Sequence, residues 1–393
     1  MTIDTQVAII GAGPAGTLLS HILDRAGIES VVVERSSREH VLGRIRAGVL
    51  EWGTVELLRE VGLGERMDIE GHVHAGTDIV WSGREILTID IETYADSRFI
   101  SYGQTNLQED LYAAADRRRA QIHFEADDVE LHDVTSNRPS ITFISGGVQE
   151  RIGADYIVGC DGFHGVSRKA IPADVVRTYH KQYPFGWLGI LSETPPVNNI
   201  VYAHHERGFA LASRRNPMLS RYYVQCPLTD TVAAWSDDRF WSELSTRLGP
   251  IVASGLVTGP SIEKSIAPLR SFVAEPMRHG SLFLAGDAAH IVPPTGAKGL
   301  NLAVSDVFYM SRALTAHYVE GSAHYLNNYS EMALRRVWGS VRFSWWLTTL
   351  LHRFPDQTEF DLRAQQAELD YLASSARAQA AMAEQYAGLP FES

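Results

Sequence analysis

The chain has 393 residues, 45% of them hydrophobic and 21% charged, which is the balance of a globular protein with a large core. The formal net charge of −12 argues against nucleic acid or an anionic membrane as a partner. Two cysteines, Cys160 and Cys226, are too few for a disulfide framework and do not have metal-ligand spacing, so we expect buried thiols and no metal. No charged-then-apolar leader and no long apolar run occurs, which predicts a cytoplasmic protein.

A strand, a glycine-rich turn and a helix are predicted near the start of the chain. The apolar run Val7 to Ile10 predicts a buried strand, and Thr17 to Leu23 has helical spacing. The sequence G-A-G-P-A-G, from Gly11 to Gly16, falls between them. A second apolar strand, Val31 to Val33, ends at Glu34, which completes a βαβ unit with an acidic residue at the expected spacing.

Each glycine of this turn has a mechanical role. Gly11 permits the tight turn, Gly13 lets the backbone approach a pyrophosphate, and Gly16 lets the helix pack closely on the strand. The helix N-terminus offers free N–H groups to phosphates, and Glu34 reaches a ribose hydroxyl. This unit alone does not separate FAD from NAD, and a turn without a ligand is the alternative.

Two later segments favour FAD. Asp161-Gly162 follows the strand-like run Tyr156 to Val158, and Gly286-Asp287 follows Leu282 to Ala285. Each places a carboxylate at the end of a buried strand, where ligands of open α/β sheets bind. Asp287 is suited to bind a ribitol hydroxyl, and Ala288 to Leu302 is expected to begin a helix beside the flavin.

The remaining elements follow from periodicity. Strands are predicted at His72 to Trp81, Ile86 to Ile91, Val129 to His132, Ile141 to Ile144 and Arg151 to Val158, the last three as a β-meander, and at Ile200 to Ala203, Gly208 to Ser213 and Arg221 to Gln225. Helices are predicted at Leu50 to Val61, Leu300 to His317, Ala323 to Leu351 and Glu359 to Gln385. Trp345 and Trp346 on one of these helices fit either core or a dimer surface, and core is favoured.

Six longer segments carry a family resemblance. They are G-R-I-R-A-G-V-L-E from Gly43, C-D-G-F-H-G from Cys160, Y-P-F-G-W-L-G from Tyr183, S-R-Y-Y-V-Q from Ser220, S-I-A-P-L-R-S-F from Ser265 and G-D-A-A-H-I-V-P-P-T-G-A-K-G-L-N-L from Gly286. In these segments, which are spread over almost the whole chain, the sequence resembles the single-component flavoprotein aromatic hydroxylases.

The resemblance implies a mixed α/β fold: a Rossmann-like FAD-binding domain, an interwoven β-sheet lobe for the substrate and C-terminal helices. We expect the FAD-binding domain at residues 1–71, 98–182 and 268–330, the sheet lobe at 72–97 and 183–267, and the helical segment at 331–393. A homodimer is also implied.

The activity that the resemblance implies is hydroxylation of 4-hydroxybenzoate to 3,4-dihydroxybenzoate, with NADPH or NADH as reductant and O2 as co-substrate, through a flavin C4a-hydroperoxide. A hydroxylase for another hydroxy- or aminobenzoate is an alternative, as is a flavin-binding redox protein without oxygenase chemistry. An NAD-dependent dehydrogenase fits the glycine turn alone.

Family motifs also imply the cofactor-binding residues. For FAD they are Gly11, Gly13, Ala15, Gly16, Glu34, Arg35, Arg44, Arg46, Ala47, Gly48, Gln104, Asp161, Asp287, Gly299, Leu300 and Asn301. For the nicotinamide nucleotide, which has no second glycine motif, they are Arg35, Arg38, His40, Arg44, His164 and Arg270. Two arginines, Arg35 and Arg38, favour a 2′-phosphate, whereas Ser36 and His40 depart from NADPH-selective members, so the nucleotide preference stays open.

The substrate carboxylate needs a guanidinium and neutral donors, which Arg215, Ser213 and Tyr223 supply by resemblance. In isolation Arg215 is a surface charge, and the neighbouring Arg214 leaves open which arginine turns inward. Pro294 and Thr295 are expected at the substrate ring, with the carbonyl of Pro294 free to contact the hydroxyl.

A proton relay is the remaining implied feature. Removing the phenolic proton makes the ring a better nucleophile, and hydroxyl groups suit that transfer. By resemblance Tyr202 contacts the phenol, Tyr386 lies behind it and His74 exchanges the proton with solvent. Catalytic roles are likewise implied for Asn301 and Lys298; the alternative for Lys298 is a solvated surface lysine.

Overall fold

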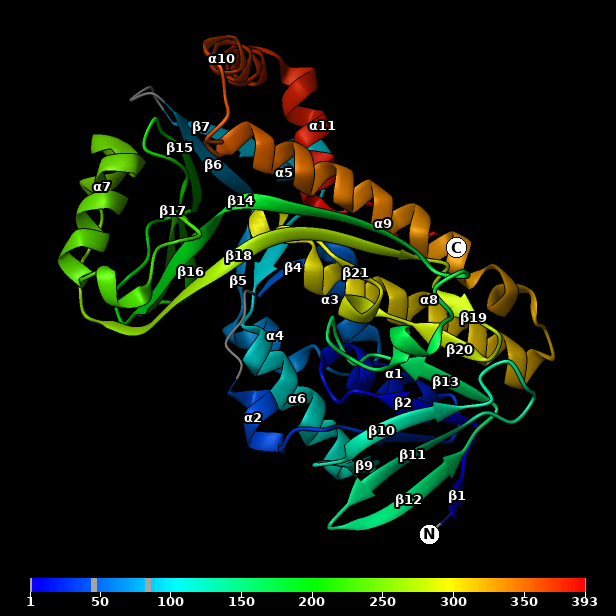
Figure 1. The fold of residues 1–393 in the computed structure, drawn as a ribbon. Helices are drawn as coiled ribbons and strands as arrows, with labels where there is room; N and C mark the ends of the chain where they lie inside the picture. The colour runs from blue at the N-terminus through cyan, green and yellow to red at the C-terminus, as the bar shows by residue number, and fades with distance from the viewer. Residues whose placement is uncertain (1, 44–47, 82–85, 393) are drawn as a thin grey trace.

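A computed structural model describes residues 2–43, 48–81 and 86–392, and its first unit is the predicted βαβ (Figure 1). β2 (Val7–Ile10) and β3 (Ser30–Val33) pair in parallel, and α1 (Pro14–Arg25) connects them. All four residues of β2 are buried because the strand lies inside a sheet covered on both faces.

This sheet has six strands in the order β19-β20-β13-β2-β3-β9, and all pairs except β19·β20 are parallel. Its strands come from distant parts of the chain, so carboxyl ends far apart in sequence meet at one edge. The other four strands of this sheet are β9 (Gln121–His123), β13 (Tyr156–Gly159), β19 (Arg278–His279) and β20 (Leu282–Leu284). α1 packs against both α6 (Gln104–Arg117) and α8 (Gly299–Glu320).

A four-stranded sheet lies beside it, in the order β1-β12-β11-β10. Its strands are β1 (Thr2–Asp4), β10 (Asp127–His132), β11 (Ser140–Ser145) and β12 (Val148–Gly153). The predicted strand Arg151 to Val158 is therefore wrong as one element. The chain leaves the meander after Gly153 and enters the parallel sheet as β13 at Tyr156. The connection has only two residues, which is too short for periodicity to mark.

The largest sheet has eight strands in the order β21-β18-β14-β17-β16-β15-β6-β7. They are β6 (Gly76–Trp81), β7 (Leu87–Asp90), β14 (Arg177–Ser192), β15 (Ile200–His204), β16 (Ala210–Asn216), β17 (Leu219–Pro227), β18 (Ser261–Glu275) and β21 (His290–Ile291). The long strands β14 and β18 run across the predicted lobe boundaries near residues 182 and 267, so the two lobes share strands. The lobe boundaries remain a prediction.

Helix α7 (Asp237–Ala253) packs on β15, β16 and β17 and encloses a separate apolar cluster (Figure 1). The sequence prediction missed this helix, and it missed α6. α7 begins at Ser236, whose side chain accepts a hydrogen bond from the backbone N–H of Arg239.

The smallest sheet has three strands in the order β4-β8-β5. They are β4 (Val49–Glu51), β5 (His72–His74) and β8 (Phe99–Ser101). Four short helices belong to this half of the chain: α2 (Arg38–Leu42), α3 (Trp52–Glu60), α4 (Glu65–Glu70) and α5 (Ile91–Ala95). Of these, α3 packs on β4 and β8, α2 packs on α6, and α5 packs on α11. The helix predicted at Leu50 to Val61 therefore begins two residues later, after a strand.

The C-terminal part is helical, with α8 and α9 (His324–Leu351) packed together and α9 also contacting β18 (Figure 1). The predicted helix Glu359 to Gln385 is wrong as one element: α10 (Glu359–Ser374) and α11 (Ala376–Ala387) meet at Ser375, whose side chain caps α11. Leu347, Leu350 and Leu351 are buried, but Trp345 is 45% exposed. Of the pair Trp345 and Trp346, Trp345 is therefore not a core residue.

Within residues 2–43, 48–81 and 86–392, no helix is long and apolar enough to cross a membrane. The same residues contain no group of three or more histidines, cysteines and acidic residues that is placed to bind a metal ion. Cys226 is buried and Cys160 is half-buried, and both are free thiols.

Candidate active site

A cavity of about 1170 Å³ opens where the parallel strands of the six-stranded sheet end. Gly11 follows β2, Glu34 follows β3, Asp161 lies just after β13 and Asp287 lies just after β20, and all four line the cavity. Sequence segments about 275 residues apart thus meet at one edge, where open α/β sheets bind ligands.

The turn after β2 is possible only with glycine. Gly11 has φ +108°, and a Cβ added to it would lie 2.4 Å from the carbonyl oxygen of Cys160. A Cβ on Gly16 would lie 2.0 Å from the carbonyl oxygen of Gly11. Gly13 faces the cavity with no heavy atom within 4 Å of the position of a Cβ, so a ligand has room to approach its backbone.

Three helix N-termini open on the same cavity. Pro14 begins α1, Gln104 begins α6 and Gly299 begins α8, and each lines the cavity. Helix N-termini carry unpaired N–H groups and partial positive charge, so together they favour an anionic ligand such as a diphosphate.

The carboxylates provide acceptors. Glu34 accepts hydrogen bonds from the backbone N–H groups of Ala12 and Ser36, both at 2.9 Å, which holds it against the glycine turn. Asp161 uses one oxygen to accept from the N–H and hydroxyl of Ser167, at 2.8 and 2.9 Å. Its other oxygen is buried without a partner among the described residues, and burial raises the pKa of this carboxyl. Such an orphaned acceptor fits a ligand hydroxyl.

A buried histidine–carboxylate hydrogen bond fixes the loop that carries Asp287. One oxygen of Asp306 accepts from the N–H of Gly286 at 2.8 Å and lies 2.6 Å from Nε2 of His290. Burial by itself lowers the pKa of His290, but the adjacent Asp306 carboxylate outweighs it and raises that pKa.

At the other end of the cavity, the lining comes from the eight-stranded sheet. Trp187, Arg221 and Tyr223 line it, as does Pro294 from the loop before α8. Arg221 is 5% exposed and forms an ion pair with Glu263 at 2.9 Å. Burial opposes its charge, but Tyr223 and Glu263 raise its pKa overall.

The sequence prediction missed Arg221. It precedes Tyr223 by two residues in β17, and residues two apart in a strand share a face, so periodicity would have placed it beside the predicted tyrosine.

The two arginines that the sequence left unresolved point to different neighbours. Arg215 is half-buried beside Tyr223 and Arg221; burial lowers its pKa and Tyr223 opposes that shift. Nη1 of Arg214 lies 3.4 Å from Nε2 of His72. Ser213 donates a hydrogen bond to the carbonyl of Arg221 at 3.0 Å, so Ser213, Arg215 and Tyr223 gather around Arg221.

The two tyrosines of the predicted relay meet. The hydroxyl groups of Tyr202 on β15 and Tyr386 on α11 lie 2.8 Å apart, and both side chains are buried. Burial raises the pKa of Tyr202 well above its ordinary value and raises that of Tyr386 to about 12.

His74 is separated from Tyr386 by the ring of Phe99. It is 3% exposed and hydrogen-bonded to Ser101 at 2.9 Å, and the ring of Phe99 contacts both His74 and Tyr386. Burial, His72 and Arg214 together lower the pKa of His74 to about 3. His74 is therefore near the tyrosine pair but is not hydrogen-bonded to it.

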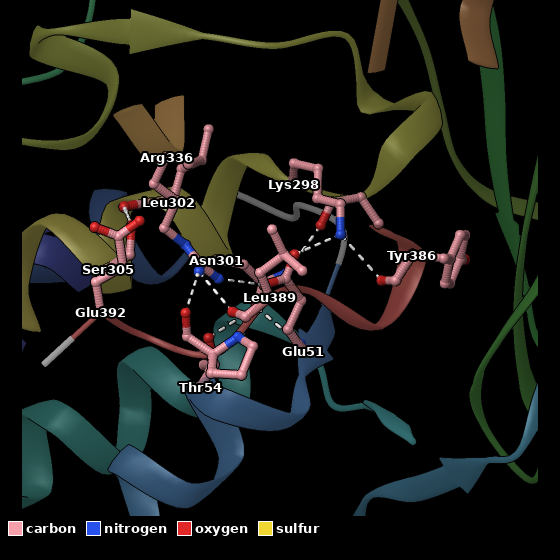
Figure 2. Close-up of polar contacts among 12 residues, drawn as sticks. Glu51, Thr54, Lys298, Asn301, Leu302, Ser305, Arg336, Tyr386, Leu389 and Glu392 are labelled. Carbon is pink, nitrogen blue, oxygen red and sulfur yellow. Dashed lines mark hydrogen bonds and ion pairs between the residues drawn. The ribbon is translucent and has the colours of Figure 1, made fainter. Parts of the chain in front are cut away.

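Lys298 and Asn301 are held by β4 and the residues after it (Figure 2). Lys298 is 2% exposed; its Nζ lies 2.6 Å from Glu51 Oε1 and donates to the carbonyl of Tyr386 at 3.0 Å. Asn301 accepts from the N–H of Glu51 at 2.9 Å and from the hydroxyl of Thr54 at 3.0 Å. Lys298 is thus not a solvated lysine. Burial lowers its pKa, and Glu51 opposes that shift.

The loop before α8 presents Pro294 and Leu300 to the cavity. The carbonyl of Pro294 accepts from the N–H of Ala297 at 3.0 Å, so one of its lone pairs is already used. Thr295 is buried and its hydroxyl accepts from that of Thr348 at 2.9 Å, which turns its side chain toward α9.

Residues predicted to bind the nicotinamide nucleotide fall into three places. Arg35 and His164 line the cavity, and the guanidinium of Arg270 lies 5.0 Å from the ring of Phe163, next to His164. Arg38 is held by Asp116 through two hydrogen bonds of 2.9 and 2.6 Å. His40 is exposed on α2.

Other predicted cofactor residues differ in their placement. Ala15 lines the cavity with Gly13, whereas Gly16 does not. Gly48 packs so closely on Tyr102 that a Cβ would lie 1.9 Å from its carbonyl oxygen. Arg44, Arg46 and Ala47 lie outside the described residues.

A parallel sheet with a glycine turn, three helix N-termini on one cavity and carboxylates after three strands defines a protein that binds a dinucleotide cofactor. The family model described as an FAD binding domain matches residues 4–344. The chain belongs to the single-component flavoprotein aromatic hydroxylases, and its cofactor is FAD, as predicted.

Three known proteins show the extent of the similarity. The chain is 52% identical over its whole length to the p-hydroxybenzoate hydroxylase of Acinetobacter baylyi and covers 97% of that protein. It is 26% identical to a probable NADH-specific resorcinol 4-hydroxylase of Rhodococcus jostii, over 77% of this chain and 57% of that one. The crystal structure of p-nitrophenol 4-monooxygenase from Pseudomonas putida superposes with a TM-score of 0.81, covering 98% of both chains at 18% identity, which confirms the predicted fold class.

Proposed function

We propose that this protein hydroxylates 4-hydroxybenzoate to 3,4-dihydroxybenzoate, with NAD(P)H as reductant and O2 as co-substrate. The observation that carries the proposal is one cavity lined by the glycine turn at one end and by Arg221 and Tyr223 at the other. A relative that is 52% identical over the whole chain bears the name p-hydroxybenzoate hydroxylase, which supports the choice of substrate.

The residues present fit FAD. The turn at Gly11 to Gly16 and the N-terminus of α1 are suited to its diphosphate, Glu34 to a ribose hydroxyl, and Asp287 with the free oxygen of Asp161 to further hydroxyl groups. Gln104, Gly299 and Leu300 would complete its binding site from the starts of α6 and α8. Bound FAD supplies the redox chemistry that activates O2 with electrons from the nicotinamide.

The carboxylate of the substrate is held by the cluster around Arg221. Arginine binds both oxygens of a carboxylate, and a buried guanidinium gains more from such a partner than an exposed one. Arg215 and Tyr223 lie beside Arg221, and Ser213 is tied to its backbone carbonyl. The ring then extends toward Pro294 and the flavin side of the cavity.

The phenolic proton passes to the tyrosine pair. Tyr202 and Tyr386 keep their own protons at neutral pH because burial raises the pKa of both. Each hydroxyl is both donor and acceptor, so Tyr202 accepts a hydrogen bond from the phenol while donating to Tyr386, and the proton shifts along the pair. His74 would serve as the outlet to solvent only after a rearrangement that hydrogen-bonds it to Tyr386, because here the ring of Phe99 lies between them. Lys298 and Asn301 fix the loop beside the flavin.

The nucleotide is accepted at the surface near Arg35, His164 and Arg270. Because Asp116 already binds the guanidinium of Arg38 through two hydrogen bonds, Arg38 offers less to a 2′-phosphate than its sequence position suggests. We therefore propose that both NADH and NADPH are used.

The test is a product analysis. Purified yellow protein is incubated with 4-hydroxybenzoate, air and either NADH or NADPH, and separately with 3-hydroxybenzoate and 4-aminobenzoate. We expect 3,4-dihydroxybenzoate from the first substrate and much slower nucleotide oxidation with the others. Faster turnover of another benzoate would correct the substrate, and nucleotide oxidation that is independent of any aromatic acid would remove the oxygenase activity.

We also propose a cytoplasmic homodimer without nucleic-acid partners. The net charge of −12 disfavours nucleic acid, and Trp345 on α9, which is 45% exposed, is suited to a subunit contact. Light scattering of the native protein and of Trp345→Ala tests this assembly: a monomeric native protein would contradict it.

A further inference from the structure

Arg336 on α9 joins three parts of the molecule (Figure 2). Its Nη2 donates to Oε2 of Glu51 at 2.9 Å, and its Nη1 donates to the carbonyl of Leu389 at 2.6 Å and lies 3.3 Å from that of Pro390. The side chain is only 12% exposed. One guanidinium thus binds β4 and the C-terminal segment together.

Glu51 is the centre of this network. Its other oxygen binds Lys298, and its backbone N–H donates to Asn301. Lys298 in turn donates to the carbonyl of Tyr386. A buried lysine, a half-buried arginine and one buried carboxylate therefore lie side by side, next to both the tyrosine pair and the loop that begins α8.

The C-terminal segment has little freedom at this point. A Cβ on Gly388 would lie 2.0 Å from Oε2 of Glu51, so the backbone after α11 packs directly on that carboxylate. Tyr386 is only two residues earlier. A shift of Glu51 or of the segment would therefore move the Tyr386 hydroxyl away from Tyr202.

We propose that Arg336 is a positioning residue for the hydroxylation: by binding Glu51 and the Leu389 carbonyl at once, it fixes Tyr386 against Tyr202 and Lys298 against the loop before α8. This inference rests on the proposed function and adds a residue that touches neither substrate nor flavin. Arginine suits the task because its planar fork binds two acceptors in fixed directions, whereas a lysine ammonium binds as a point charge.

The experiment uses the full-length, FAD-loaded protein and three variants. Arg336→Gln removes the charge, Arg336→Lys keeps it without the fork, and Arg335→Gln is the matched control. Arg335 is the next residue on α9, is 57% exposed and binds Glu392 and Glu331 but not Glu51. Two quantities are measured: the pH at which bound 4-hydroxybenzoate ionises, followed by its absorbance, and the product formed per NAD(P)H oxidised.

In Arg336→Gln we expect the ionisation midpoint of bound 4-hydroxybenzoate to rise by about one pH unit, because its phenolate loses the aligned tyrosine pair. This is a roughly tenfold decrease of the acid dissociation constant of the bound phenol. We expect the product yield to fall about threefold, Arg336→Lys to lie between, and Arg335→Gln to match the unaltered protein.

A midpoint and yield in Arg336→Gln equal to those of Arg335→Gln would overturn the proposal. Should Arg336→Gln fail to fold, Arg336→Lys decides alone: an unchanged midpoint contradicts the role of the fork. Absence of hydroxylation in the unaltered protein is a separate result, since it defeats the proposed function before any variant is compared.

Discussion

The nucleotide end of the cavity is built from backbone, whereas the relay beside it is built from side chains. At the nucleotide end, a glycine turn and three helix N-termini present N–H groups, and the chain geometry leaves no room for other residues at Gly11 or Gly16. At the relay, Tyr202 meets Tyr386 and Lys298 meets Glu51 across 184 and 247 residues of sequence. The backbone site is therefore recognised from a short motif, whereas the contacts between the side chains are seen only in the fold.

The largest effect is expected at the backbone end. Gly11→Ala places a Cβ 2.4 Å from the Cys160 carbonyl at φ +108°, so the turn must open and FAD binding should be lost. Measurement of bound flavin by absorbance should show an almost colourless protein. Gly27→Ala is the control, because Gly27 also has positive φ but no atom within 4 Å, and it should cost only about 1 kcal/mol of stability while the protein stays yellow.

The second largest effect is expected at the side chains that we propose bind the substrate. Arg221→Gln removes the buried guanidinium that lines the cavity, so the dissociation constant of 4-hydroxybenzoate should rise about 100-fold, the equivalent of about 3 kcal/mol. Titration of the flavin spectrum with substrate measures it. The exposed Arg239 gives the control Arg239→Gln, and equal affinity in both variants would remove Arg221 from the carboxylate site.

The burial of His74 should make the protein less stable in acid. The pKa of His74 is about 3 in the folded protein and 6.5 ordinarily, so below pH 6.5 the unfolded chain takes up a proton that the folded chain does not. The free energy of unfolding should therefore fall as the pH drops from 6.5, with His74 contributing about 2 kcal/mol of the loss by pH 5. Urea unfolding of His74→Gln should show a correspondingly flatter pH dependence, and an unchanged slope would contradict it.

The mildest change is the removal of one hydroxyl. Tyr202→Phe leaves packing intact but breaks the hydrogen bond to Tyr386, so substrate should bind while the product formed per NAD(P)H falls about tenfold and peroxide appears instead. Peroxide and 3,4-dihydroxybenzoate are measured together. Full product yield would remove Tyr202 from the relay.

Parts of the fold that depend on residues adjacent in sequence could be predicted, and other parts could not. The βαβ unit, Asp161 and Asp287 followed from motifs, because strand, turn and carboxylate are neighbours in sequence. The split of the predicted strand Arg151 to Val158 did not, since only two residues separate its two parts, which join different sheets.

Side-chain partners were harder to predict. A catalytic role was predicted for Lys298 by resemblance, but its ion pair with Glu51 and the link to Arg336 depend on how α8, α9 and β4 pack. Arg221 was within reach of strand periodicity, and the orientation of Arg214 toward His72 was not.

The most direct test of the hydroxylation itself is the fate of dioxygen. The FAD-loaded protein is given 4-hydroxybenzoate, NADH or NADPH and isotopically labelled O2, and the product is examined by mass spectrometry. We predict one labelled oxygen in 3,4-dihydroxybenzoate, at the new hydroxyl. Unlabelled product, or nucleotide oxidation that yields only peroxide, would contradict the proposed oxygenase function.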